Sequence, residues 1–168
     1  MDLYILRHGI AEEQAPDTSG GDSQRRLTAE GCKKIRSAAK GMKALELEFD
    51  LILSSTFLRA KETAEIVARV LGANKALHLS PALAADGNPK ALIDDLKAQH
   101  KKRSSVLLVG HEPYLSRLIS LLISGDTGIS INLKKGGLCK LSTQSLQYGR
   151  CATLEWFLTP GQMRCVRG

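Results

Sequence analysis

The chain alternates short apolar runs with longer segments whose apolar residues recur at helical spacing, and this alternation constrains its fold most strongly. Short apolar runs indicate strands, and helical spacing indicates amphipathic helices packed on a sheet. Strands are predicted at residues 2–6, 51–53, 76–79 and 105–109. Helices are predicted after the cap residue Thr28, over about 57–71, from Asn88-Pro89 onward and over about 113–124.

Repeated strand–helix–strand units predict a mainly parallel sheet with right-handed connections and helices on both faces. The C-terminal part differs, because runs at 137–142 and 151–158 are separated by a turn-prone stretch and predict a hairpin. The predicted fold class is therefore α/β in three layers, with a mainly parallel central sheet flanked by helices on both faces and a C-terminal β-hairpin at its edge. Residues 1–168 are interpreted as a single domain, with a mobile polar loop at 17–24.

Composition excludes several classes of protein. The chain has 168 residues, 43% of them hydrophobic and 24% charged, which fits a globular and not a disordered protein. Its apolar stretches, such as 118–123, are far shorter than the roughly 20 residues that span a membrane. The N-terminus also lacks the pattern of a signal peptide. We therefore expect a cytoplasmic protein that makes no membrane contact.

The cysteines give no sign of a metal site. Cys32, Cys139, Cys151 and Cys165 have neither the close spacing nor the neighbouring histidines of a zinc site. They are interpreted as idle or buried thiols in a reducing compartment. We therefore expect neither a bound metal nor a disulfide.

Positive charge is unevenly distributed along the chain. There are 24 Lys and Arg against 17 Asp and Glu, a net charge of +7. Residues 1–96 carry 13 basic and 14 acidic side chains, whereas residues 97–168 carry 11 and 3. Such a surplus suggests an anionic partner, of which nucleic acid is the first candidate. However, three Tyr, three Phe and one Trp are too few for an obvious base-stacking surface, so no nucleic-acid partner is expected.

Three predicted strands end in residues suited to anion binding. The first runs into Arg7-His8-Gly9, the second into Ser54-Ser55 with Arg59 a helical turn later, and the fourth into Gly110-His111-Glu112. The carboxyl ends of parallel strands share one edge, where open α/β sheets bind ligands. Arginine can hold two phosphate oxygens at once, glycine allows close approach, and a helix N-terminus adds N–H donors. The sequence therefore predicts a site for a tetrahedral dianion.

Histidine in such a site can act as a nucleophile. Neighbouring guanidinium charges should lower its pKa, so that the ring is neutral near pH 7. The sequence contains no carboxylate cluster suited to Mg²⁺ and no Gly-x-x-x-x-Gly-Lys loop. We therefore expect no metal, nucleotide or other cofactor.

The same residues resemble the motifs of the histidine phosphatase superfamily, which includes the phosphoglycerate mutases. Leu6-Arg7-His8-Gly9 is similar to its RHG motif, Ser54-Ser55-x-x-x-Arg59-Ala60-x-x-Thr63-Ala64 to its second motif, and Gly110-His111 to its third. The compact length resembles the small branch of SixA-type phosphohistidine phosphatases. So do Leu27-Thr28-x-x-Gly31, Pro81-x-Leu83 and Leu158-Thr159-Pro160.

The resemblance implies roles for the matched residues. His8 is implied to be the nucleophile that becomes a transient phosphohistidine, with Arg7, Arg59 and His111 binding the phosphoryl oxygens. The residues implied to line the substrate site are Gly9, Ser54, Ser55 and Gly110. For the two serines, phosphate contact and helix capping both remain open. The implied function is a metal-independent phosphatase whose substrate is a phosphohistidine-bearing protein, for example a histidine phosphotransfer domain.

One departure from the larger family members concerns the leaving group. Many of them place an acidic residue after the third strand to protonate an alkoxide, whereas this chain has Ala84-Ala85-Asp86 there. Asp86 is the nearest candidate acid, with Glu12 and Glu112 as alternatives. An imidazole or acyl phosphate leaving group needs little help from an acid. The departure therefore favours phosphohistidine as substrate and argues against mutase activity.

Two other functions remain open. One is a broader small-molecule phosphomonoesterase that uses Asp86 as its acid. The other is a non-catalytic basic module that binds phosphoproteins or nucleic acid through residues 97–168, which the intact nucleophile His8 disfavours. The surplus charge is interpreted either as a surface that attracts an acidic phosphoprotein or as a solubility feature.

Overall fold

The computed structural model describes residues 1–13, 21–99 and 103–166. These residues contain a six-stranded sheet in the order β3-β2-β4-β1-β5-β6. The strands are β1 (Asp2–Arg7), β2 (Leu51–Ser54), β3 (Leu77–Leu79), β4 (Ser105–Gly110), β5 (Leu138–Ser142) and β6 (Thr153–Leu158). Strands β1 to β4 pair in parallel, and β5 and β6 are added antiparallel at one edge. The sheet is thus mixed, with its parallel part containing the predicted site.

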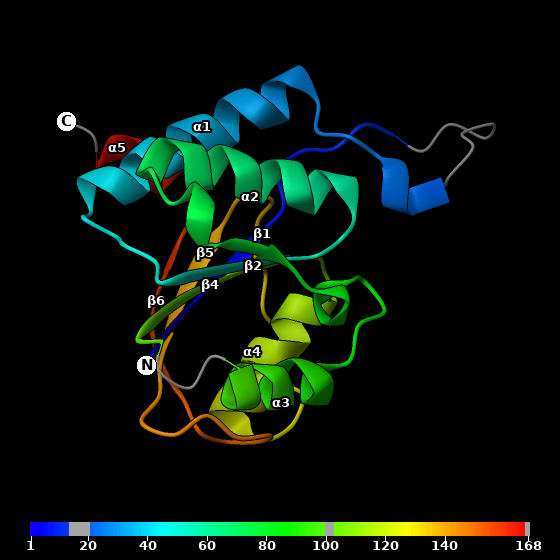
Figure 1. Ribbon diagram of the computed structural model, residues 1–168, viewed down its shortest axis with the longest axis vertical. Coiled ribbons are helices and arrows are strands. Elements are labelled where there is room, and N and C mark those ends of the chain that lie inside the picture. Colours follow the sequence, from blue (N-terminus) through cyan, green and yellow to red (C-terminus); the bar gives the residue numbers. More distant parts are fainter. Residues whose placement is uncertain (14–20, 100–102, 167–168) are drawn as a thin grey trace.

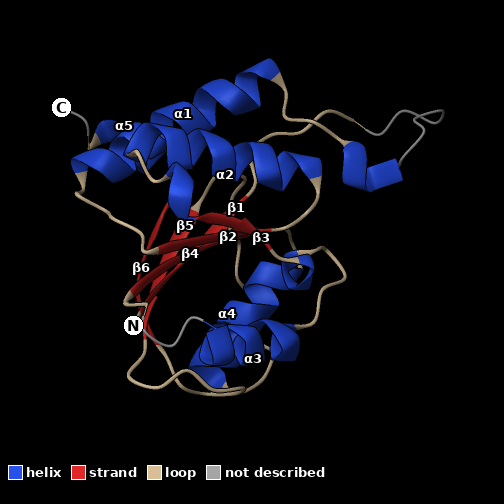
Figure 2. Cartoon of the chain, in the orientation of Figure 1, coloured by secondary structure: helices blue, strands red, loops and turns tan. Residues whose placement is uncertain are grey.

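Helices cover both faces of the sheet (Figures 1 and 2), with α1, α2 and α5 on one face and α3 and α4 on the other. The α-helices are α1 (Ala29–Ala44), α2 (Leu58–Leu71), α3 (Pro89–Gln99), α4 (Tyr114–Ser124) and α5 (Pro160–Cys165). The described residues also form three short 3-10 helices, η1 (Gly21–Gln24), η2 (Asn74–Ala76) and η3 (Pro81–Leu83). This arrangement confirms the predicted three-layer α/β fold with a hairpin at the sheet edge.

Two elements differ from the sequence prediction. The predicted loop at 17–24 lies partly outside the described residues, and its second half, Gly21–Gln24, is the helix η1. The unpredicted helix α5 begins with a capping box, in which Thr159 Oγ1 accepts from the Gln162 N–H and the Gln162 side chain accepts from the Thr159 N–H. At six residues, α5 is too short to show helical periodicity, which explains why the pattern missed it.

The side chains of β1 alternate between two cores, as expected for a strand covered on both faces. Leu3 and Ile5 pack with residues of α3 and α4, whereas Tyr4 and Leu6 pack with residues of α1, α2 and α5. Within the described residues, no helix combines the length and apolar character needed to cross a bilayer.

The register of the central strands brings the predicted strand ends together. Arg7 lies opposite Gly110, and Ser54 lies opposite Val109. One step further, the His8 N–H donates to the Gly110 carbonyl at 3.0 Å. The predicted convergence of three strand ends at one edge is therefore confirmed.

Helix α1 packs unusually close to the segment that follows His8. Thr28 caps α1 by accepting from the Gly31 N–H at 2.9 Å, and the Thr28 N–H donates to the Ile10 carbonyl at 3.0 Å. A β-carbon built on Gly31 would lie 2.1 Å from the Ile10 carbonyl oxygen, far inside van der Waals contact. The absence of a side chain at Gly31 therefore sets the distance between α1 and the site.

Gly31→Ala is expected to destabilise the protein by roughly 2–4 kcal/mol, because α1 must move away from Ile10. The direction of the change in the free energy of unfolding is informative, since Gly→Ala in an unhindered helix stabilises by up to about 1 kcal/mol. Urea unfolding followed by circular dichroism measures the effect. Lys40→Ala, at an exposed position of α1, is the control and should change stability by less than about 0.5 kcal/mol. An unchanged or increased free energy of unfolding for Gly31→Ala would contradict the packing argument.

Candidate active site

Two imidazoles and a buried guanidinium meet where β1, β2 and β4 end. The ring centroids of His8 and His111 are 5.1 Å apart. Arg59, in the first turn of α2, donates from Nε to His8 Nε2 at 3.3 Å. The exposed fractions are 6% for His8, 5% for Arg59 and 1% for His111. The fold thus buries a cation beside two titratable rings, an arrangement typical of functional sites.

The contacts of His8 define which ring nitrogen carries the proton. Because a guanidinium N–H can only donate, the His8 Nε2 that receives the Arg59 bond is an acceptor. The other nitrogen, Nδ1, lies 2.7 Å from the Gly9 carbonyl and donates to it. The ring is therefore the Nδ1–H tautomer, with its Nε2 lone pair directed at the guanidinium. A nitrogen nucleophile needs this orientation to attack an anion held by Arg59.

The backbone around His8 is fixed by contacts from two other segments. The Gly9 N–H donates to Thr63 Oγ1 at 3.1 Å, and the Thr63 hydroxyl donates to the Arg59 carbonyl at 2.7 Å. Thr63 therefore joins the end of β1 to the turn of α2 that carries Arg59. The Gly136 N–H donates to the His8 carbonyl at 3.1 Å from the opposite side.

Burial keeps His8 neutral. It lowers the pKa of His8 to about 3, and nearby positive charges on His111, Arg59 and Arg7 act in the same direction, while the bond to the Gly9 carbonyl opposes them. The sequence correctly predicts the direction of this pKa shift. The main cause is different, because desolvation of the ring outweighs the guanidinium charges.

His111 is oriented by Ser55 and covered by Phe57. The Ser55 hydroxyl lies 2.8 Å from His111 Nε2 and accepts from the Phe57 N–H at 3.2 Å. Its own proton can therefore be donated to Nε2, which leaves Nδ1–H of His111 as a donor. The Phe57 ring lies 5.0 Å from the His111 ring, and burial, followed by the charge of Arg59, lowers the pKa of His111 to about 4.

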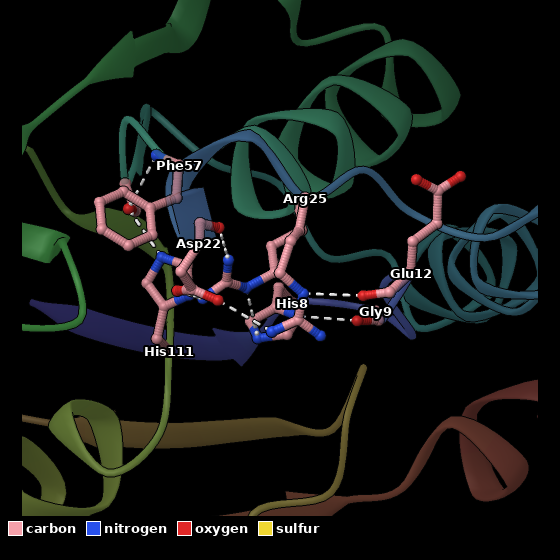
Figure 3. A network of polar contacts seen from close by, with 9 residues as sticks. His8, Gly9, Glu12, Asp22, Arg25, Phe57 and His111 are labelled. Atoms are coloured by element: carbon pink, nitrogen blue, oxygen red, sulfur yellow. Dashed lines mark hydrogen bonds and ion pairs between the residues drawn. The ribbon is translucent and has the colours of Figure 1, made fainter. Parts of the chain in front are cut away.

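Asp22 of η1 provides a carboxylate that contacts the site, although the sequence gives no indication of it (Figure 3). Arg59 donates from Nη2 to Asp22 Oδ2 at 2.7 Å and from Nη1 to the Asp22 carbonyl at 2.6 Å. Arg25 donates to Asp22 Oδ1 at 2.8 Å. Burial raises the pKa of Asp22, but the bonds and charges of Arg25 and Arg59 outweigh it and hold that pKa below its usual value. An ionised carboxylate therefore occupies guanidinium donors of Arg59 that could otherwise bind an anionic ligand.

Arg7 contributes charge from the end of β1. Its Nη1 donates to the Leu133 carbonyl at 2.9 Å, and its charge lowers the pKa of both His8 and His111. Arg7 Nε and His111 Nδ1 are buried and have no hydrogen-bond partner within the described residues. An unpaired buried donor costs roughly 1–3 kcal/mol. The oxygens of a bound anion are acceptors of the kind that would offset this cost.

The remaining predicted site residues have structural contacts. The buried Ser54 hydroxyl donates to the Ser55 carbonyl at 3.0 Å. Gly110 leaves room for its neighbours, since a β-carbon there would lie 3.1 Å from a methyl carbon of Leu115 and 3.3 Å from the Leu83 carbonyl oxygen. The Ser55 hydroxyl contacts both His111 and the N–H of Phe57, the residue before α2, and the N-cap residue Phe57 makes no side-chain cap hydrogen bond.

The three candidate acids lie in different surroundings. Asp86 is exposed in the turn after η3 and makes no hydrogen bond or ion pair within the described residues. Glu112 accepts from the Ser116 N–H at 3.1 Å and from its hydroxyl at 2.6 Å. These contacts hold the Glu112 side chain against the first turn of α4. The Glu12 carbonyl accepts from Arg25 at 2.7 Å.

Metal-ligating side chains do not gather in the part of the chain that the structure describes. Within residues 1–13, 21–99 and 103–166, no three His, Cys, Asp or Glu side chains are placed to hold a metal ion. Cys32, Cys139, Cys151 and Cys165 are all free thiols.

The site as a whole defines a class of protein. A neutral buried imidazole whose Nε2 faces an arginine, beside a second imidazole and a second arginine at the carboxyl edge of a parallel sheet, can capture a tetrahedral dianion and attack it. The model of the histidine phosphatase superfamily (branch 1) matches residues 3–84. An uncharacterized protein of Picosynechococcus sp. is 34% identical over 160 residues, which cover 94% of each chain. The chain belongs to the histidine phosphatase superfamily, and its relatives support a phosphatase.

Two further similarities extend over nearly the whole length. The phosphohistidine phosphatase SixA of Escherichia coli (strain K12) is 27% identical over 168 residues, covering 99% of each chain. The solved structure of a protein histidine phosphatase SixA complexed with tungstate superposes with a TM-score of 0.80 and 28% identity, over 96% of this chain and 98% of that one.

The pKa of His8 leads to a prediction for stability. Between about pH 6.5 and about pH 3 the unfolded chain protonates this ring while the folded protein keeps it neutral. The unfolded state binds more protons in that window, so the free energy of unfolding should fall as the pH falls, by up to about 1.4 kcal/mol per pH unit for one histidine. Urea unfolding at several pH values should show a smaller slope for His8→Asn than for the wild type. His78→Asn, at an exposed position of β3, is the matched control, and equal slopes for His8→Asn and wild type would contradict the assignment.

The carboxylate of Asp22 leads to a prediction for anion binding. Asp22→Asn should tighten the binding of inorganic phosphate about fivefold. The substitution removes the partly exposed ion pair between Asp22 and Arg59, worth roughly 1 kcal/mol, which competes with phosphate for the guanidinium. Isothermal titration calorimetry measures the dissociation constant. Asp94→Asn, which breaks the exposed pair of Asp94 with Lys90 at 2.7 Å on α3, should leave phosphate affinity unchanged. Weaker phosphate binding by Asp22→Asn would show instead that Asp22 positions Arg59 for the anion.

Proposed function

We propose that this protein is a metal-independent phosphohistidine phosphatase, which removes phosphate from protein phosphohistidine through a covalent intermediate on His8. The observation that carries the proposal is the setting of His8, which is buried and neutral, with Nε2 directed at Arg59 and His111 beside it. Similarity over the full chain to the phosphohistidine phosphatase SixA of Escherichia coli supports this class of substrate.

The proposed reaction has two displacements at phosphorus. Arg59 and His111 bind phosphoryl oxygens while Arg7 adds positive charge, and the Arg59 Nε–H passes from His8 Nε2 to an oxygen, which frees the lone pair. Nε2 attacks phosphorus in line as the P–N bond to the substrate imidazole breaks, and that imidazole takes a proton from solvent. Water then attacks the phosphorus on His8, inorganic phosphate leaves, and the ring returns to its neutral form.

The surroundings of the nucleophile support a good leaving group. Asp22 is held ionised by Arg25 and Arg59, so it is a poor proton donor. Asp86 is exposed and, within the described residues, makes no hydrogen bond or ion pair that would fix it near His8. Without a positioned acid, departure of an alkoxide is slow, whereas departure of an imidazole is much less affected. This difference favours phosphohistidine over sugar phosphates and other alkyl esters.

The proposed partner is a protein that carries phosphohistidine, for example a histidine phosphotransfer domain. The proposed location is the cytoplasm, a reducing compartment in which four free cysteines would stay reduced. No metal or organic cofactor takes part in the proposed steps.

Trapping tests the intermediate directly. Wild-type protein mixed with a phosphohistidine donor and quenched in base should carry acid-labile phosphate on His8, identified by mass spectrometry of the peptide. His8→Ala should carry none and should turn over at least about a thousandfold more slowly, because the nucleophile is lost. EDTA should leave turnover unchanged. Inhibition by EDTA that added metal reverses would contradict the metal-independent mechanism.

Substrate selectivity separates the proposal from its alternatives. A phosphohistidine peptide should be hydrolysed far faster than a sugar phosphate, and Asp86→Asn should leave the first rate unchanged. A broader phosphomonoesterase would hydrolyse the sugar phosphate well and lose that activity in Asp86→Asn. Tight binding of a phosphoprotein without turnover, retained in His8→Ala, would indicate a binding module instead.

A further inference from the structure

A cationic groove lies next to the site, bounded by α1, the loop that precedes β5, and α5. It encloses about 750 Å³ and is lined by ten residues of the described part of the chain. Five of these are cationic and none is acidic, the cationic ones being Arg7, Lys34, Lys134, Lys135 and Arg164. Most of this charge comes from the C-terminal part of the chain, which holds the surplus of basic residues. Part of the surplus of basic residues in the C-terminal part is therefore located in this groove.

The charge of the groove is largely unneutralised. Lys134, Lys135 and Arg164 are exposed, and none of them forms an ion pair within the described residues. Lys34 pairs with Glu30 at 2.7 Å, but both side chains are exposed, so this pair is easily exchanged. At least three positive charges thus face solvent in one concave surface without a partner in the described part of the chain.

The groove is continuous with the candidate active site through Arg7. Arg7 is one of the residues that line the groove, and its charge also lowers the pKa of His8 and His111. The Gly136 N–H lies 3.0 Å from the Arg7 carbonyl and 3.1 Å from the His8 carbonyl. The loop that carries Lys134 and Lys135 is therefore attached directly to the backbone of the proposed nucleophile.

The helix that carries Arg164 is also held firmly against the body of the protein. A β-carbon on Gly41 of α1 would lie 2.0 Å from the Met163 carbonyl oxygen, so α1 and α5 are in very close backbone contact. The cations of the groove thus project from three segments whose backbones are packed close to His8. A surface of this kind can select a partner by the positions of its charges.

We propose that this groove binds acidic side chains that surround the phosphohistidine on the protein substrate. The inference rests on the proposed function and names the recognition surface that would deliver a phosphoprotein to His8. Carboxylates of a protein surface fit the groove better than a second phosphate does, because its charges are spread over α1, α5 and a loop and include lysines, which bind as point charges. The groove should raise affinity and association rate without taking part in the chemistry.

The test compares a protein substrate with a small one. Lys134→Glu combined with Arg164→Glu should lower kcat/KM at least about tenfold for a phosphorylated, acidic histidine phosphotransfer domain, through KM rather than kcat. For phosphoramidate, kcat/KM should change less than about twofold. Arg69→Glu combined with Lys75→Glu, which are exposed at the far end of α2 and in η2, makes the same charge change and should affect neither substrate. Circular dichroism and melting curves of the variants check that the fold is retained.

Salt provides a second measurement. Between about 0.05 and about 0.5 M NaCl, wild-type kcat/KM should fall for the phosphoprotein and stay flat for phosphoramidate, and the groove variant should lose this salt dependence. Equal losses with both substrates, or no loss with the phosphoprotein, would overturn the proposal. So would a groove variant that loses binding of RNA while its rate on the phosphoprotein is unchanged.

A binding experiment separates failure of the groove from failure of the proposed function. In the His8→Ala background, the dissociation constant of the phosphorylated domain is measured by calorimetry with and without the two groove substitutions. If the wild type shows no phosphatase activity but the groove substitutions still weaken binding about tenfold, the proposed function is wrong and the groove proposal is supported. If the activity is present and binding is unaffected, the groove proposal fails alone.

Discussion

The parallel pairing of β1 with β4 is the constraint on which the rest of the site depends. Its register places Arg7 opposite Gly110 and extends one residue further, through the bond from the His8 N–H to the Gly110 carbonyl. His8 and His111 therefore leave adjacent strands at the same level, and their rings lie 5.1 Å apart. Shifting this pairing by one residue would turn one imidazole into the opposite core, because side chains alternate along a strand.

Burial of the two imidazoles determines their chemistry. Removing them from water lowers the pKa of both rings, so that His8 is neutral and holds a lone pair at neutral pH. Arginines beside the rings are tolerated because the Asp22 carboxylate and two carbonyl groups, those of Leu133 and Asp22, accept hydrogen bonds from them. The same carboxylate competes with an anionic ligand for Arg59. The site thus balances the buried cation Arg59 against the anion Asp22, which compensates its charge.

Much of the fold and part of the site could be predicted from the sequence, because both depend on local patterns. The apolar runs and their helical neighbours define the layers, and motifs at strand ends follow from parallel pairing. Three contacts could not be predicted, namely those of Asp22, Thr63 and Phe57 with the site. Asp22 reaches Arg59 across 37 positions from a four-residue 3-10 helix, a structure too short to leave a periodic signal.

The sequence by itself determined the succession of strands and helices along the chain, the residues at the strand ends and the excess of positive charge in the C-terminal part. These features follow from residue type and from spacing along the chain. Only the tertiary structure decided that desolvation is the main cause of the low pKa of His8, that Asp22 binds Arg59, and that cations from three segments line one groove beside Arg7. Such properties depend on distances through space and on exclusion of water, and the chain acquires both only when its distant segments pack together.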